Sequence, residues 1–199
     1  MPTSFYHQIP LIIEIVRTLS PRSILDVGVG FGKYGFLLRE YMELWDESTK
    51  AYGVWNIKID GIEIYDKYLT PCHKYIYNNI YLGKAQDIVG TIHESYDLVL
   101  LIDVIEHLPK QEGYHLVRSL KEIASDILIT TPKTFVKQKV VFNNEYEQHK
   151  SFWTEKDFKK IAPLIVIPDR LSLIIVMGKN IQLLKHIRRK RFLRNIIPF

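Results

Sequence analysis

The chain has 199 residues, 47% of them apolar, and its 27 Lys and Arg against 22 Asp and Glu give a formal net charge of +5. This composition excludes a disordered body and suffices for one domain with a sizeable core. The single cysteine, Cys72, excludes an internal disulfide and a thiolate metal site, and it suits a reducing cytoplasm. Because no long uncharged apolar run is present, we expect a cytoplasmic monomer or homodimer without a membrane span.

The positive charge is concentrated at the end of the chain. Every Asp and Glu precedes residue 170, so residues 1–178 hold 20 basic and 22 acidic side chains, a net of −2, and residues 179–199 add +7. We therefore expect one domain over 1–178, with helix 7–19 as a cap, and a basic tail over 179–199. The tail suits a surface helix or an anchor for an acidic partner, nucleic acid or membrane, and a solvated end is favoured.

The spacing of apolar residues alternates along the chain between helical and strand periods. Helical spacing from Ile9 to Leu19 predicts a first helix, which ends at Ser20-Pro21. The elements predicted after it are, in order, strand 23–27, helix 33–45, strand 57–64, helix 66–77, strands 80–82 and 96–102, helix 110–123, strand 127–130, helix 154–161, and strands 164–167 and 171–177.

Strands interleaved with helices at this pace predict a parallel sheet with helices on both faces. The run from Leu98 to Ile102 is apolar without alternation, which is typical of a central strand. The turn Pro168-Asp169-Arg170 is too short for a crossover, so the last two strands pair antiparallel. The predicted fold is α/β: a doubly wound, seven-stranded, Rossmann-like sheet, mostly parallel, with a C-terminal antiparallel hairpin.

A glycine-rich loop, Asp26–Gly32, lies between the first strand and the next helix. Glycines let the backbone turn sharply and approach a ligand, and the helix behind them presents free N–H donors to an anion. A phosphate-binding P-loop is excluded because three residues, not four, lie between Gly28 and Gly32, and Lys33 is not followed by Ser or Thr. A dinucleotide fingerprint at Gly30–Gly35 begins several residues past the strand and is a weak match.

The pattern acid-x-Gly-x-Gly-x-Gly resembles the first motif of class I S-adenosylmethionine-dependent methyltransferases. Three further motifs resemble that family in the same order, with Glu63 ending the second strand, Gly83–Asp87 following the third and Asp103–Leu108 following the fourth. The resemblance spans roughly residues 20–178 and implies S-adenosyl-L-methionine as cofactor. The cofactor-binding residues that it implies are Asp26, Gly28, Gly30, Gly32, Glu63, Ala85, Asp87, Asp103 and Val104.

The resemblance also implies roles for the acids. Glu63 matches the carboxylate that binds the ribose diol, since its two acceptor oxygens suit two hydroxyl donors. Asp87 matches the acid that accepts from the adenine amino group, and Asp103–Leu108 matches the segment that closes over the methionine part. The interval from Gly32 to Glu63 is longer than usual, which predicts an insertion near 46–55 and leaves Asp60 as an alternative to Glu63.

Methyl transfer from a sulfonium is an in-line displacement, so a base or metal is needed only when the acceptor must lose a proton. On a first helical turn, Asp103, Glu106 and His107 share one face, and His149 follows in the long loop 133–151. In one interpretation, Glu106 and His107 order the turn and His149 is a loop residue or general base. In the other, these three residues and Asp103 bind a divalent cation, as in the ubiquinone-biosynthesis O-methyltransferases and the enzymes that 2′-O-methylate small-RNA 3′ ends, which this arrangement resembles.

The sequence favours the interpretation without a metal, with Glu106, His107 and His149 as catalytic residues. It predicts a methyltransferase that acts on a small-molecule or sugar-like acceptor by O-methylation. Two alternatives stay open: a metal-dependent RNA 3′-end 2′-O-methyltransferase whose basic tail grips phosphates, and a non-catalytic cofactor-binding module. The segment Lys133–Lys150 is long enough to be a lid over the acceptor site.

Overall fold

The computed structural model describes residues 4–44 and 54–196, and it confirms the predicted α/β fold. One seven-stranded sheet has the order β3-β2-β1-β4-β5-β7-β6. The first five strands pair in parallel, and β7 runs antiparallel to both β5 and β6. The strands are β1 Ser23–Val27, β2 Lys58–Glu63, β3 Asn79–Leu82, β4 Tyr96–Ile102, β5 Ala124–Pro132, β6 Leu164–Ile167 and β7 Ser172–Gly178.

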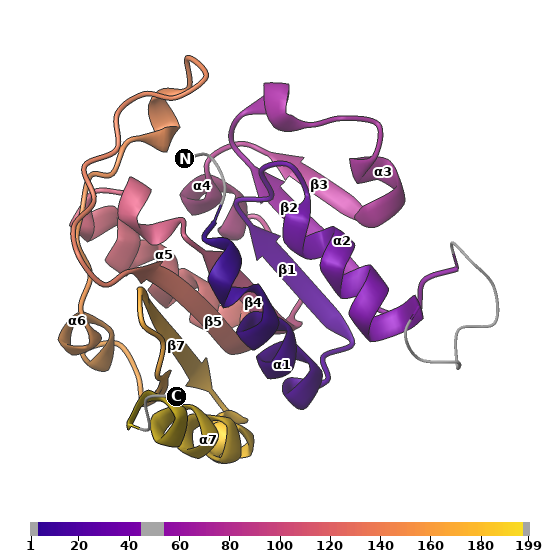
Figure 1. Ribbon diagram of the computed structural model, residues 1–199. Coiled ribbons are helices and arrows are strands. Elements are labelled where there is room, and N and C mark those ends of the chain that lie inside the picture. Colours follow the sequence, from indigo (N-terminus) through magenta and orange to yellow (C-terminus); the bar gives the residue numbers. More distant parts are fainter. Residues whose placement is uncertain (1–3, 45–53, 197–199) are drawn as a thin grey trace.

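Helices cover both faces of this sheet, with α1 and α2 on one side and α4 and α5 on the other (Figure 1). Each face has its own apolar core; Ile12 and Leu38 belong to the first, and Leu116 and Phe158 to the second. The α-helices are α1 Ile9–Leu19, α2 Lys33–Arg39, α3 His73–Ile76, α4 Ala85–Val89, α5 Lys110–Ile123, α6 Glu155–Lys159 and α7 Lys185–Ile196. Short turns are η1 Tyr6–Gln8, η2 Glu40–Leu44, η3 Asp66–Tyr68, η4 Ile105–His107, η5 Glu145–Glu147 and η6 Ile181–Leu184.

Two predicted helical regions differ from the structure, and one helix of the structure was not predicted. The helix expected over 66–77 is divided into η3 and α3, because Pro71 disfavours helical backbone at the residue before it. The helix expected over 33–45 continues from α2 into the wider turn η2, and residue 45 lies outside the described residues. Helix α4 was not predicted, since five residues are too few for a helical period to be detected. The expected insertion near 46–55 lies almost entirely outside the described residues.

The favoured interpretation of the tail as a solvated end is wrong for residues 181–193, which form η6 and most of α7. Leu184 and Ile187 are fully buried in the same apolar core as the inward residues of α1. They lie three residues apart, which is the spacing of side chains on one side of a helix. Ion pairs join Lys190 to Glu14 at 3.1 Å and Arg191 to Asp169 at 3.3 Å. One side of this helix is therefore part of the domain.

The N-terminal helix packs on the sheet face, where Ile12, Ile15 and Val16 are completely buried. Only the segment before it, residues 4–8, reaches the mouth of the cavity described below. No helix among residues 4–44 and 54–196 is long and apolar enough to cross a membrane.

Candidate active site

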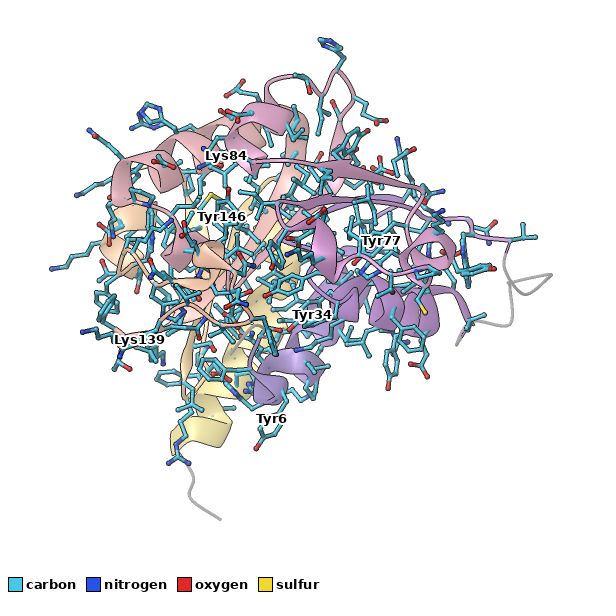
Figure 2. The ribbon with its side chains drawn as sticks, turned by 90° about the horizontal axis from the view of Figure 1, so that it is seen from above. Tyr6, Tyr34, Tyr77, Lys84, Lys139 and Tyr146 are labelled. Atoms are coloured by element: carbon cyan, nitrogen blue, oxygen red, sulfur yellow. The ribbon has the colours of Figure 1, made fainter. Side chains whose placement is uncertain are left out.

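A cavity of about 510 Å³ opens at the carboxyl ends of the central strands. The strand order reverses between β1 and β4, and crevices at such a switch point are the usual ligand sites of doubly wound sheets. The glycine loop forms one wall, and the segment from Pro132 to Lys150 supplies much of the other. Figure 2 shows from above three of the lining residues, Tyr34, Lys84 and Tyr146.

The glycine loop has a backbone that other residues adopt only with strain. Gly28, Gly30 and Gly32 have φ values of +84°, +54° and +82°. A side chain at Gly28 would collide with Val104, whose nearest methyl group lies 2.5 Å from the ideal Cβ position. At Gly30 the same position meets no atom within 4 Å, so this part of the loop borders open space in the cavity. A ligand can therefore approach the loop backbone closely at Gly30.

Glu63 ends β2 and lies buried in the cavity wall. One carboxylate oxygen accepts the N–H of Gly30 at 2.7 Å, and the other accepts the N–H of Tyr65 at 2.8 Å. Burial raises the pKa of Glu63, and these two hydrogen bonds oppose the shift. Since each carboxylate oxygen can accept a second bond, a pair of adjacent hydroxyls can still be bound. Asp60, the alternative, accepts the hydroxyl of Tyr96 and is not among the described lining residues.

Two of the predicted cofactor-binding acids lie outside the cavity wall. Asp26 is buried beneath the loop, where it accepts the Tyr77 hydroxyl at 2.7 Å, and burial raises its pKa to about 6. Asp87 is exposed on α4, and the neighbouring Ala85 and Gln86 line the cavity in its place. Gly32 starts helix α2 behind the wall, whereas Val104 lines the cavity as expected.

Asp103 is held by the N-terminal segment. Its backbone has a φ of +53°, and its carboxylate accepts Gln8 Nε2 at 2.7 Å, the Phe5 N–H at 3.2 Å and the Thr130 hydroxyl at 2.7 Å. Lys33 fastens the same segment by donating to the Ser4 carbonyl at 2.9 Å. The sequence predicted a cap over 7–19 but not the contacts of Phe5 and Gln8 with Asp103, because no local pattern signals a contact between positions 95 residues apart.

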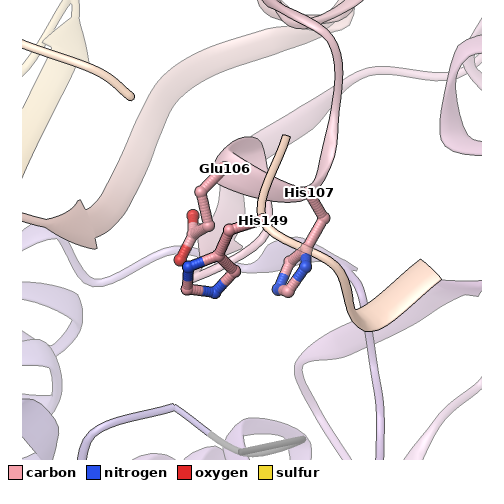
Figure 3. A group of neighbouring side chains, drawn as sticks. All are labelled: Glu106, His107 and His149. Atoms are coloured by element: carbon pink, nitrogen blue, oxygen red, sulfur yellow. The ribbon is translucent and has the colours of Figure 1, made fainter. Parts of the chain in front are cut away.

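Glu106, His107 and His149 each present a ligand-type atom, and these atoms lie within 4.8 Å of one another (Figure 3). The turn η4 after β4 positions the first two, and the loop supplies His149. The Lys150 and Ser151 N–H groups donate to the Glu106 carbonyl at 2.7 and 3.0 Å, which fastens the loop to this turn. Asp103 is not part of the group, because its carboxylate is engaged by Gln8, Phe5 and Thr130.

Carbonyl groups fix the proton on each of the two imidazoles. His107 Nδ1 lies 3.2 Å from the Gln148 carbonyl, and His149 Nδ1 lies 2.5 Å from the Val136 carbonyl. Since a carbonyl only accepts, each Nδ1 carries the proton and each Nε2 keeps a free lone pair. Burial and the neighbouring imidazole lower the pKa of His107 to about 4, and burial lowers the pKa of His149. Both rings are therefore neutral near pH 7.

Glu106 is the least satisfied polar group of the site. It is buried, and its Oε2 has no hydrogen-bond partner among the described residues. Burial, reinforced by the charge of Asp103, holds the pKa of Glu106 well above its usual range. A buried acid with a free oxygen is costly unless a partner satisfies it. With two imidazole lone pairs beside it, this acid can join in binding a cation or in moving a proton.

No family model matches the sequence, and no curated protein is similar to it. Solved structures are similar in fold. A SAM-dependent methyltransferase from Archaeoglobus fulgidus is 15% identical with a TM-score of 0.59, covering 85% of this chain and 94% of its own. Magnesium protoporphyrin IX methyltransferase from Synechocystis PCC 6803, with SAH bound, is 16% identical with a TM-score of 0.58, covering 87% and 83%.

The N-terminal domain of EvdMO1, in the presence of SAH and D-fucose, is 12% identical with a TM-score of 0.63, covering 89% of this chain and 85% of its own. A Nostoc punctiforme protein, a proposed O-methyltransferase, is 15% identical with a TM-score of 0.61; the match covers 87% of this chain and 56% of that protein. The chain thus has the fold of the class I SAM-dependent methyltransferases.

Proposed function

We propose that the chain is an S-adenosyl-L-methionine-dependent methyltransferase that methylates an oxygen of a small-molecule or sugar-like acceptor. The observation that carries this proposal is the continuity of one cavity. Its wall runs from the glycine loop and Glu63 to Glu106 and His149, so a donor and an acceptor can lie side by side in one cavity. The EvdMO1 domain, which has this fold, was crystallised with SAH and D-fucose.

The donor end fits the cofactor. Glu63 would accept from the ribose hydroxyls, the backbone at Gly30 would lie close to the sugar and methionine parts, and Ala85 and Gln86 would border the adenine. When bound, the cofactor supplies an electrophilic methyl group on a sulfonium. The chain then has to orient donor and acceptor in line and exclude water.

The acceptor end fits a hydroxyl that must lose a proton. His149 is neutral, its Nε2 lone pair is free and its ring lines the cavity, so we assign it as the general base. The buried Glu106 beside it would stabilise the protonated imidazole that results. Of the two histidines His149 is the better base, because burial weakens the basicity of His107 further.

A divalent cation is the second candidate for the acceptor end. Three observations favour it: ligand atoms of Glu106, His107 and His149 within 4.8 Å, both Nε2 lone pairs free, and an unpartnered oxygen on Glu106. Such a cation would lower the pKa of an acceptor hydroxyl. The ligands would be these three side chains, without the Asp103 expected from the sequence. The RNA-end and non-catalytic alternatives gain no specific support from the site.

Calorimetry with S-adenosylmethionine and S-adenosylhomocysteine tests the activity class. We expect both to bind the wild-type protein and Glu63→Ala to weaken binding about 100-fold or more, since two hydrogen bonds to a charged acceptor are lost. Asp87→Ala is the matched control and should bind as the wild type does, because Asp87 is exposed and outside the cavity wall. An absence of binding, or binding that ignores Glu63→Ala, would remove the proposal.

Cobalt(II) absorption spectroscopy distinguishes the two acceptor-end mechanisms. If a cation is used, Co²⁺ should give visible bands that His149→Ala abolishes and that His115→Ala, on the exposed side of α5, leaves unchanged. Chelation would then stop methyl transfer. If His149 acts as a base without a metal, Co²⁺ gives no such bands and methyl transfer continues in chelator.

A further inference from the structure

Helix α7 has an exposed side that carries three cations and one aromatic residue. Lys185, Arg188, Arg189 and Phe192 follow the spacing i, i+3, i+4, i+7, which places them on one side of the helix. All four are exposed, and Phe192, at 58% exposure, lies among the three cations. We call this set the α7 face. Figure 1 shows helix α7 at the lower end of the molecule, and the exposure of these four side chains places the α7 face toward solvent.

The inward side of the same helix has neutralised charges. Ile187 is buried, Lys190 pairs with Glu14 and Arg191 pairs with Asp169. By contrast, no carboxylate in the described part of the chain forms an ion pair with Lys185, Arg188 or Arg189. The basic residues of this helix therefore divide into those that attach it to the domain and those that remain available to an anionic partner.

Apolar side chains accompany these available cations. Leu183, in the turn just before α7, is 47% exposed, and Leu193 next to Phe192 is 51% exposed. Single exposed apolar residues are ordinary, but Phe192 and Leu193 lie beside cations that have no ion-pair partner in the described part of the chain, a combination that suits a charged bilayer surface.

We propose that the α7 face binds the surface of an anionic phospholipid bilayer. The cations would meet lipid phosphates, while Phe192 and the neighbouring leucines would enter the boundary between headgroups and acyl chains. Nucleic acid is a poorer match, because phosphates and stacked bases use cations and aromatic rings but leave aliphatic leucines without a partner. The proposal does not depend on the methyltransferase activity, since the cavity and this face are formed by different residues.

Vesicle flotation with the full chain tests this proposal. We expect the protein to bind vesicles that contain 30% phosphatidylglycerol, to ignore pure phosphatidylcholine, and to be released as salt rises. Arg188→Ala with Arg189→Ala should lower partitioning about 25-fold, at about fivefold for each cation. Phe192→Ser should lower it roughly tenfold with no change in charge. These residues are exposed, so the variants should unfold at the wild-type temperature.

A matched control separates the α7 face from net charge. Arg118→Ala with Lys156→Ala removes two exposed cations elsewhere and should bind anionic vesicles like the wild type. Equal loss in the control, no binding by the wild type, or no effect of Phe192→Ser would overturn the proposal. A single-stranded RNA is the competing ligand: if RNA is bound with the same residue dependence while anionic vesicles are not, the face is a nucleic-acid surface and the proposal is wrong.

Discussion

The two ends of the cavity satisfy their polar groups in different ways. At the donor end, both oxygens of Glu63 accept backbone N–H groups, and Asp103 accepts three hydrogen bonds. At the acceptor end, Glu106 has an unpartnered oxygen beside two imidazoles whose Nε2 lone pairs are free. The chain thus satisfies the carboxylates of the donor end by itself, whereas the Glu106 carboxylate of the acceptor end keeps one oxygen available to a ligand.

This difference has a thermodynamic meaning. Unsatisfied buried groups lower the stability of the ligand-free protein, and natural chains retain them where function needs them. Substitutions of the polar groups at the donor end should therefore lower the free energy of unfolding. Substitutions that remove polar groups at the acceptor end should raise it.

The strongest test of this contrast is Glu106→Gln. We expect methyl transfer to fall about 10²- to 10⁴-fold, because the substitution removes the carboxyl group that we assign to proton transfer beside His149. At pH 8 the variant should nevertheless unfold at a higher temperature, because a neutral amide does not carry the burial penalty that raises the pKa of Glu106. Rates and thermal unfolding check both effects. Glu122→Gln, exposed on α5, is the control, and a less stable Glu106→Gln protein would break the comparison.

Asp26 gives the donor end a pH-dependent stability. Its pKa, raised by burial to about 6 from 3.8, means that the folded protein binds the proton more tightly than the unfolded chain does. The resulting stabilisation is complete below about pH 3.8 and is lost as pH rises through 6, a change of roughly 3 kcal/mol.

Asp26→Asn should remove this dependence, since an amide is neutral at every pH. Urea unfolding of both proteins at pH 4, 5, 6 and 7 should show the variant gaining stability relative to the wild type as pH rises. Parallel profiles over this window would mean that Asp26 ionises as easily in the folded protein as in the unfolded chain.

The fold could be predicted because its signals are local. Strand β4 and helix α5 lie where their periodicity placed them, and the Pro168-Asp169-Arg170 turn fixed the antiparallel hairpin. The tail was mispredicted because its many charges hid a short inward stripe, Leu184 and Ile187. Two buried side chains are enough to attach a helix, but they are too few to give a clear period.

The order of the motifs predicted which residues follow the strand ends, but it did not predict the contacts that distant segments make with them. The positions of Glu63, Glu106 and His107 follow from strand ends, which any doubly wound sheet brings to one edge. The place of Asp103 did not follow, because a segment far away in sequence, residues 4–8, occupies its carboxylate. Asp87 lies outside the wall since it is the third residue of a helix that the sequence did not predict.

Two glycines of the loop should affect different properties: Gly28 the stability of the fold, and Gly30 the binding of a ligand. Gly28→Ala should lower the free energy of unfolding by about 2 kcal/mol more than Gly30→Ala, because its methyl group collides with Val104. Gly30→Ala carries only the strain of a positive φ, yet its methyl group enters the space that a ligand would fill. Denaturant unfolding and cofactor calorimetry should therefore rank the two variants in opposite orders. The same order in both measurements would contradict the assignment of Gly30 to the cavity wall.

The smallest expected effect concerns the N-terminal segment. Gln8 is completely buried; its Nε2 donates to Asp103, but its Oε1 has no partner in the described structure. Gln8→Leu therefore loses one hydrogen bond to a charged group and also removes one unsatisfied oxygen, for a net loss of about 1 kcal/mol. Gln182→Leu, at an exposed position of η6, should change stability less.

Hydrogen exchange gives the sharper measurement, because the Phe5 N–H donates to the same carboxylate oxygen that Gln8 engages. In Gln8→Leu the amide of Phe5 should exchange faster, while the amides of Gly30 and Tyr65, held by Glu63, keep their protection. Faster exchange at all three positions would mean that the donor end opens as one unit. Faster exchange at Phe5 alone would mean that residues 4–8 can detach from Asp103 while the hydrogen bonds of Glu63 to Gly30 and Tyr65 stay closed.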